Sequence, residues 1–366
     1  MDAREFKREL LDKETSMTYA VDHPMMSGRE VEIECGFKMS REAIDMARKR
    51  KMEGDDDYTL ENIIKYKKHH LLENDEQDIL IFGDDLAVRR LATTHVIHAD
   101  RTFTCILAGY SQLYIFHATV ENNLSVPVLF CLVKGKNEAT YVKLLGLVEG
   151  LAYEENLTIF TREVTLMCDF ELSFINAVQL LYKSVQVKCC FFHFVQNIRK
   201  NAVKLINAAK RAHGENSMRH LDMLKKERRI MMLPLVPQEL INPELVNLIT
   251  GNTEGRSELS LDLKALRDNV LKTYVGKRRV RSGPVLAPRF PLPLWNVSGM
   301  ASRTNNAAES VHAQMNPKVS GKLSVFNFIR IIEEEMKRTN DRTSAERKRE
   351  TRAVEGAKNR LLAVEL

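Results

Sequence analysis

Three acidic residues, far apart in the chain, stand where a carboxylate needs a partner or a ligand. Asp100 interrupts the apolar segment THVIHADRTFTCI, and Asp169 follows the apolar run VTLMC at its carboxyl end. Glu309 lies in the first turn of a predicted helix. A carboxylate in a buried strand costs several kcal/mol unless it is paired or binds a metal ion. Brought together, three such acids could hold two Mg²⁺ or Mn²⁺ ions about 3.5–4 Å apart and catalyse in-line phosphoryl transfer.

Each acid also has an ordinary structural interpretation. Asp100 and Asp169 could be strand-end or turn aspartates paired with a nearby Lys or Arg. Asn306 and Glu309 have the spacing of a capping box, in which the glutamate bonds back to the N-cap amide. Glu171 is a competing acid, but we expect it to start the next helix, where a negative charge suits the dipole. The sequence leaves these alternatives open.

Cys190 and His193 have the spacing of half a zinc site. A closed site needs four ligands, and the sequence has no second CxxH or CxxC pair. We therefore interpret them as a buried cysteine that ends a strand and a histidine that starts a helix, which argues against zinc. His193 could instead contact a scissile phosphate, and so could His312, one turn after Glu309 on the same helical face.

The elements that must position these residues follow from the apolar pattern. From His95 onward, three apolar segments bounded by turn residues or charge predict a three-strand meander. The rest predicts helix, strand, helix, strand and a basic helix, which completes the order βββαβαβα. That order predicts an α/β, ribonuclease H-like fold, with a mixed sheet flanked by helices. In such a sheet the middle of the first strand, the end of the fourth and a late helix converge, which would unite the three acids.

The remaining segments suggest how the chain is divided. Residues 1–92, rich in charge and helix formers, predict a helical lead-in. The ribonuclease H-like core is expected over 93–335, with an all-helical insertion at about 213–295 before the last catalytic helix. That insertion shows repeated helical patterns and ends in the proline-rich stretch GPVLAPRFPLPLW. Residues 336–366 predict a charged helical tail.

Composition and charge narrow the classes of partner. Of the 366 residues, 44% are hydrophobic and 28% charged, which excludes a mostly disordered chain. The net charge is +6, and the basic residues are clustered, which suits a polyanion such as DNA because each phosphate contact releases counterions. Any one cluster could also be a solvated helix face. The predicted DNA-binding residues are Lys277, Arg278, Arg279, Arg281, Arg199 and Lys200.

Several other classes of protein are disfavoured. No apolar run approaches the roughly 20 residues that a membrane span needs, and the N-terminal stretch MDAREFKRELLDKE lacks the apolar region of a secretory signal. The six cysteines lie mostly in apolar segments and are expected to be reduced. We expect an intracellular protein with no membrane partner and no small-molecule cofactor.

The same residues carry a family resemblance. The segments HADRTF, CDFELSFINAV, CCFFHFVQNIRK, PLPLWNV and SRTNNAAESVH resemble successive signatures of Mutator-like element (MULE) transposases. The resemblance implies a DDE catalytic core in which Asp100, Asp169 and Glu309 bind Mg²⁺ or Mn²⁺, with a CxxH element at Cys190 and His193. It also implies transposon ends and target DNA as partners and a nuclear location, and it is compatible with a homo-oligomer.

The sequence departs from the family pattern in two places. Arg101 stands where the family usually has a glycine, and strand alternation would point it to the face opposite Asp100. Residues 1–92 lack the Cys and His ligands of a zinc-binding DNA-recognition module, since Cys35 stands alone. We predict a DNA transposase core. The alternatives are a decayed or domesticated relic that binds DNA or proteins without catalysis, and another ribonuclease H-like nuclease.

Overall fold

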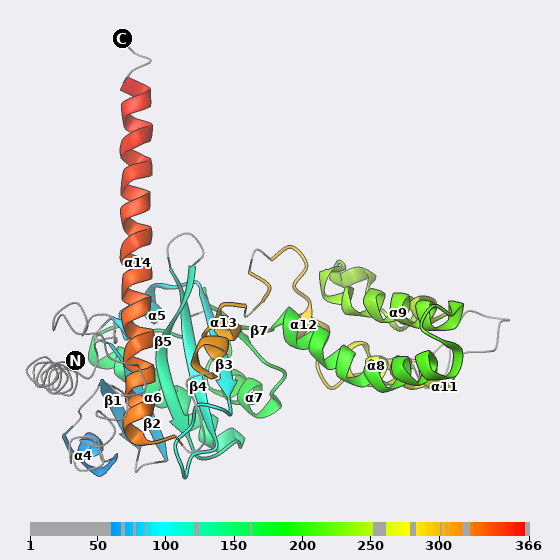
Figure 1. The fold of residues 1–366 in the computed structure, drawn as a ribbon, viewed down its shortest axis with the longest axis horizontal. Coiled ribbons are helices and arrows are strands. Elements are labelled where there is room, and N and C mark those ends of the chain that lie inside the picture. Colours follow the sequence, from blue (N-terminus) through cyan, green and yellow to red (C-terminus); the bar gives the residue numbers. More distant parts are fainter. Residues whose placement is uncertain are drawn as a thin grey trace, which may run out of the picture.

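The central feature of the structure is a seven-stranded mixed sheet with helices on both faces (Figure 1). The structure is a computed structural model. For Asn306–Glu309 it describes the backbone of the helix but not the side chains. It describes residues 60–66, 70–75, 78–84, 86–120, 124–161, 163–251, 261–278, 283–300, 302–304, 306–316 and 323–362.

Five strands of the sheet lie in the spatial order β5-β4-β3-β6-β7, which is that of a ribonuclease H-like fold. The antiparallel meander consists of β3 (Val96–Thr102), β4 (Gln112–Val120) and β5 (Leu124–Val133). Two strands parallel to β3 follow, each reached through a helix: β6 (Thr165–Cys168) and β7 (Gln186–Cys189). The predicted order βββαβαβα and the fold class are therefore confirmed.

Two further strands extend the sheet beyond β5, and they correct the expected helical lead-in. Residues Leu71–Asp75 (β1) and Ile79–Gly83 (β2) form a hairpin, and β2 pairs with β5. The prediction of helix over residues 1–92 is wrong for these two segments. The strand β2 is a five-residue apolar run buried on both faces, with no alternation to mark it as a strand, and β1, LLEND, is short and largely polar. Helices are found at Leu60–Tyr66 (α4) and Ala87–Thr93 (α5). Residues 1–59 lie outside the described part.

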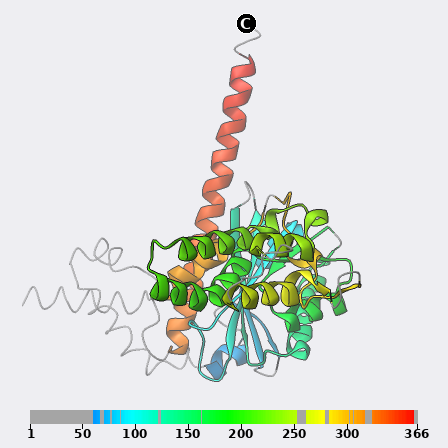
Figure 2. The same ribbon diagram turned by 90° about the vertical axis from the view of Figure 1, so that its right-hand side faces the viewer.

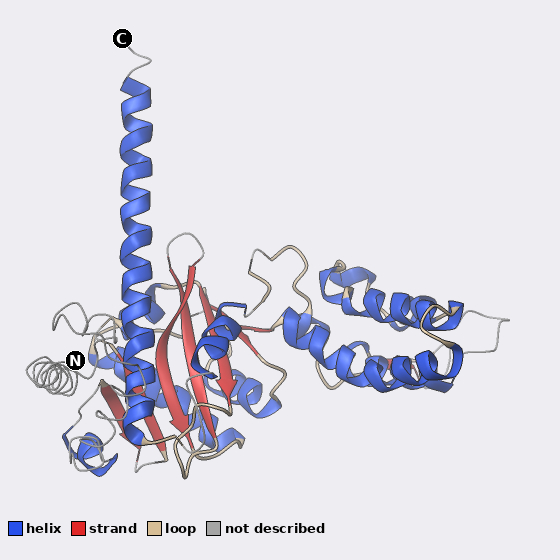
Figure 3. Ribbon diagram, viewed as in Figure 1, coloured by secondary structure: helices blue, strands red, loops and turns tan. Residues whose placement is uncertain are grey.

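Alternate residues of the strands supply two hydrophobic cores. On one face, α5, α6 (Glu138–Glu154) and α7 (Leu172–Leu181) pack on the sheet, and the Tyr114 and Phe174 rings stack with centroids 4.8 Å apart. The other face is covered by α4, α13 (Asn306–Met315) and α14 (Val325–Leu362). There the Phe82 and Phe328 rings meet edge to face at 5.6 Å. Both faces are thus covered by helices, as Figure 3 shows.

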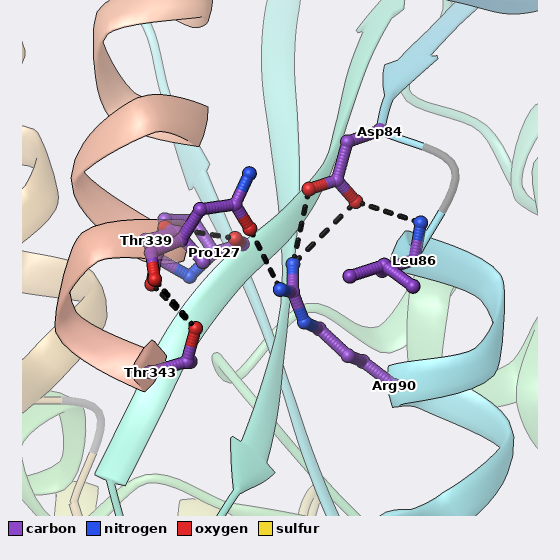
Figure 4. Close-up of polar contacts among 7 residues, drawn as sticks. Asp84, Leu86, Arg90, Pro127, Thr339 and Thr343 are labelled. Carbon is purple, nitrogen blue, oxygen red and sulfur yellow. Dashed lines mark hydrogen bonds and ion pairs between the residues drawn. The ribbon is translucent and has the colours of Figure 1, made fainter. Parts of the chain in front are cut away.

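Polar contacts fasten the first half of α14 to the sheet (Figure 4). Arg90 of α5 pairs with Asp84 at 3.1 Å and donates a hydrogen bond to Asn340 of α14 at 2.7 Å. Thr339 donates to the carbonyl of Pro127 on β5. Beyond these contacts α14 extends away from the sheet (Figure 1). The charged tail expected over 336–366 continues this helix without a break as far as Leu362.

A group of helices lies beside the sheet, next to its β7 edge (Figures 1 and 2). Trp295 is buried there and donates from its indole to the carbonyls of Tyr274 and Phe290, which ties the proline-rich segment to the helices. The expected insertion is helical except for the paired two-residue strands β8 (Lys277–Arg278) and β9 (Val285–Leu286). Its helices, preceded by α8 (Phe191–His213), are α9 (Met218–Met231), α10 (Pro243–Thr250), α11 (Leu261–Val270), the π-helix Leu271–Val275 and α12 (Leu292–Trp295), with 3₁₀ turns at Leu233–Leu235 and Gln238–Leu240.

None of the described helices is long and apolar enough to cross a membrane.

Candidate active site

Two of the predicted acids lie side by side at the carboxyl edge of the sheet, where β3, β6 and β7 end. The parallel strands β3 and β6 are neighbours, and their register pairs Ile97 with Leu166 and His98 with Met167. The same offset, carried two residues further, places Asp100 level with Asp169. The prediction that these acids come from adjacent strands of one sheet is confirmed, and open α/β sheets bind ligands at such an edge.

Asp100 is buried on the face of the sheet that α13 covers. Its residue is only 3% exposed, and one carboxylate oxygen lies 3.6 Å from Nδ1 of His312. Burial raises the pKa of Asp100, while the nearby His312 and His193 lower it. The net effect is a raised pKa, so the charged carboxylate is unfavourable here unless a cation offsets the desolvation.

Asp169 is held at the start of the loop after β6 and faces the beginning of α8. Its Oδ1 atom accepts a hydrogen bond from the amide of Phe170 at 2.6 Å and lies 3.9 Å from Nδ1 of His193. Burial opposes a charge on His193, but a hydrogen bond with Cys190 and the charge of Asp169 raise its pKa to about 9. His193 is therefore a cation at neutral pH. Cys190 is buried and N-caps α8 through its backbone conformation alone.

Arg101 reaches this site, which strand alternation did not predict. Its guanidinium pairs with Glu171 at 2.7 Å and lies 3.7 Å from Oδ2 of Asp169. Burial would lower the pKa of Arg101, but the two carboxylates raise it. Arg101 lies on the face opposite Asp100, as strand alternation predicted. Alternation fixes the face of a side chain but not its reach, and the long arginine extends past the end of its strand to Asp169 and Glu171.

Glu171 is the N-cap of α7, as predicted, but its carboxylate does not cap the helix. Besides pairing with Arg101, it accepts a hydrogen bond from the Tyr141 hydroxyl at 2.8 Å, and Gln112 donates to that hydroxyl at 2.8 Å. Burial raises the pKa of Glu171 against the opposing effects of Arg101 and Tyr141. A polar chain thus runs from β4 to Asp169. No motif in the sequence indicates it, because its members come from four separate elements.

The helix α13 brings the third predicted acid to this region. His312, one turn after Glu309, contacts Asp100, and the amide of Phe191 donates to the carbonyl of Arg303 at 3.0 Å. The segment before α13 is thereby joined to the start of α8. The side chain of Glu309 lies outside the described part of the structure. Its direction, toward the aspartates or toward the amide of Asn306, stays a prediction.

The donor atoms of this cluster suit a divalent cation. Asp100 and Asp169 supply carboxylate oxygens, the ligands that Mg²⁺ and Mn²⁺ prefer. Beside them, Nε2 of His312 is buried without a hydrogen-bond partner, and burial lowers the pKa of His312, so this nitrogen keeps a lone pair. Nδ1 of His193 also lacks a hydrogen-bond partner, but a protonated imidazole is not a metal ligand. Within the described side chains, no group of three or more His, Cys, Asp or Glu is arranged to hold a metal ion. A complete carboxylate set would therefore need Glu309.

The predicted DNA-binding residues divide into two groups. Arg199 and Lys200 are exposed on α8, less than two turns after His193. Arg278 pairs with Glu244 at 3.0 Å and donates to the carbonyl of Gly283, so it stabilises the insertion itself. Lys277 is exposed, 3.9 Å from Asp268. Arg279 and Arg281 lie outside the described residues.

The fold and this acidic edge define a ribonuclease H-like protein. Residues 96–197 match the MULE transposase domain, which confirms the resemblance to Mutator-like element transposases. The matched segment contains Asp100, Asp169 and His193, whereas Glu309 and His312 follow it. No curated protein matches the chain.

Proposed function

We propose that the protein is a DNA transposase core that cleaves and transfers DNA strands by metal-dependent phosphoryl transfer. The observation that carries this proposal is the register of β3 and β6, which sets Asp100 level with Asp169 at the carboxyl edge of the sheet. Both acids lie inside the segment that matches the MULE transposase domain.

Each residue of the site has a role in this proposal. Asp100, Asp169 and Glu309 would hold two Mg²⁺ or Mn²⁺ ions, which when bound activate a water or a 3′-hydroxyl and stabilise the leaving oxygen. His193, charged at neutral pH, would pair with a non-bridging oxygen of the scissile phosphate. His312 would orient the Asp100 carboxylate, because burial lowers its pKa and keeps the imidazole neutral.

DNA is the partner that this activity requires. Arg199 and Lys200 extend the cationic surface from the site along α8, where phosphates on either side of the cut bond would lie. A DNA substrate would place the protein in the nucleus. Pairing of two transposon ends would call for more than one copy of the chain, so we propose a homo-oligomer on DNA.

A second candidate function rests on Arg101. Its guanidinium lies 3.7 Å from Asp169 and pairs with Glu171, so a fixed positive charge already offsets part of the acidity of the site. Such a charge repels a divalent cation. The alternative is therefore a DNA-binding relic of a transposase that no longer cuts.

Cleavage of a pre-nicked DNA substrate in Mn²⁺ tests the proposal. The wild-type protein should cut, Asp169→Asn should not, and Asp341→Asn, an exposed carboxylate on α14, should cut like the wild type. DNA binding, measured by fluorescence anisotropy, should be equal in all three. Normal cutting by Asp169→Asn would refute the site. A wild type that binds but never cuts, together with an Arg101→Gly variant that does, would establish the relic and identify the arginine as the cause.

A further inference from the structure

A large aromatic ring is left half exposed beside the candidate active site. Phe103 follows β3 directly and is 51% exposed, although the neighbouring residues of the strand are largely buried. A single exposed apolar residue is ordinary on a protein surface. The position of Phe103 is what sets it apart, because Arg101 contacts both its ring and the site.

Two cations lie against this ring. The ammonium of Lys136, an exposed residue between β5 and α6, is 4.5 Å from the ring centroid, and the Cζ atom of Arg101 is 5.2 Å from it. The two cations differ in how freely their side chains can move. Arg101 is fixed by its ion pair with Glu171, whereas Lys136 carries its charge on a flexible, solvent-exposed stem that can move off the ring.

The charge and shape of this surface suit a nucleotide. An aromatic ring offers a face on which any base can stack, and adjacent cations attract the phosphates on either side of that base. Bases inside a duplex are already stacked on their neighbours and cannot offer a face. A single ring at the carboxyl edge of the sheet therefore suits an unpaired nucleotide at a nick or strand end.

We propose that Phe103 and Lys136 form a subsite for an unpaired nucleotide of the DNA substrate, with the base stacked on the Phe103 ring and its phosphate paired with Lys136. The base takes the place of the Lys136 ammonium on the ring, while Arg101 stays behind and links the subsite to Asp169. The proposal rests on the proposed function, since it presumes that DNA ends are brought to this edge. It adds a specific contact by which a strand end is held next to the acids.

The test measures binding to three fluorescently labelled DNA duplexes in EDTA, so that no strand is cut. One duplex is blunt, one has a short single-stranded 3′ end with bases, and one has the same end built from abasic nucleotides. The wild type should prefer the base-bearing end to the abasic end by about 10-fold, the effect expected of one stacked base. Equal binding to both ends would overturn the proposal.

Variants of the full chain separate stacking from other effects. Phe103→Ala and Phe103→Leu should both lose the preference for bases, because leucine keeps the apolar bulk but has no aromatic face, and Phe103→Trp should keep it. Lys136→Gln should weaken binding to both single-stranded ends alike and reduce the salt dependence by about one unit of slope. Tyr153→Ala, which removes an aromatic ring that is 81% exposed on α6, is the matched control and should change nothing.

The outcomes distinguish this subsite from the proposed function. Phe103→Leu that keeps the full preference for bases would overturn the subsite while leaving the cleavage assay, and the assignment of Asp169, untouched. A wild type that binds none of the three duplexes would overturn both proposals. Binding of an acidic peptide in competition with the base-bearing end, lost in Phe103→Ala, would show that the surface serves a protein partner and would also overturn the nucleotide subsite.

Discussion

Charged side chains are buried and paired at the carboxyl edge of the sheet, but on α8 they are exposed to solvent. Asp100 is 3% exposed, and the side chains of the Arg101–Glu171 pair are 23% and 11% exposed. Arg199 and Lys200, in contrast, are exposed on α8. Buried charges have fixed geometry and strong local fields, whereas exposed charges attract a polyanion over a long range with little geometric demand. We infer that DNA cleavage and DNA binding depend on different side chains, although α8 contributes side chains to both.

Removing the charge of Asp100 should abolish DNA cleavage while DNA binding is kept, and this is the largest effect that we expect. Asp100→Asn keeps the size of the side chain but removes a proposed metal ligand, so we expect cleavage to fall by roughly 10³-fold or more. DNA affinity should stay unchanged, because the cations on α8 are intact. Cleavage of pre-nicked DNA and anisotropy on the same protein measure the two effects.

The same variant also tests the burial of Asp100 through the pH dependence of stability. Because burial raises the pKa of this carboxyl in the folded state, its ionised form destabilises the fold at neutral pH, and that penalty disappears as the pH falls through the folded pKa. Metal-free Asp100→Asn should therefore be more stable than the wild type at pH 7, with a smaller difference in acid. Urea unfolding at both pH values measures it, and a variant less stable at pH 7 would contradict the burial argument.

Much of the sheet could be predicted because its strands are long apolar segments bounded by turns. The hairpin before the core was missed because β2, ILIFG, is a five-residue run without alternation. The proximity of Asp100 and Asp169 could be predicted, because strand order determines which strand ends are neighbours. The ion pairs of Arg101 could not be predicted, because they depend on the length of its side chain and on the path of the chain after β6, where Asp169 and Glu171 lie. The side chain of Glu309 stays a prediction.

Breaking the Arg101–Glu171 pair should affect stability more than breaking an ion pair in solvent. Arg101→Met removes the ion-pair partner of the largely buried Glu171 carboxylate and leaves it the hydrogen bond from the Tyr141 hydroxyl, so we expect the free energy of unfolding to fall by about 2 kcal/mol. The matched control is Arg89→Met, because Arg89 pairs with Glu155 at 2.8 Å and is 67% exposed. Its loss should cost less than about 0.5 kcal/mol. Similar losses in urea unfolding would show that the buried pair has no special role.

Neutralising the exposed cations Arg199 and Lys200 of α8 should weaken DNA binding while DNA cleavage is kept. The double variant Arg199→Gln, Lys200→Gln should bind DNA about 10-fold more weakly at moderate salt, and its salt dependence should fall by about two units of slope. The rate of cleavage at saturating DNA should not change. Lys183→Gln serves as the control. It removes an exposed lysine just before β7, at the amino end of that strand and so at the end of the sheet opposite to the acids. If the control weakens binding as much, the attraction is a general effect of net charge.

The smallest expected effect asks whether the insertion unfolds separately from the sheet. Ser217 is the N-cap of α9, where its hydroxyl accepts a hydrogen bond from the amide of His220 at 3.2 Å. Ser217→Ala should weaken α9 by about 1 kcal/mol, whereas Ser217→Asp keeps an acceptor and should restore it. Hydrogen exchange followed by mass spectrometry should show faster exchange in α9 with unchanged protection in β3 and β4, because separate units open independently. Equal acceleration in β3 would mean that insertion and sheet form one cooperative unit, so that loss of a distant cap loosens the strand that carries Asp100.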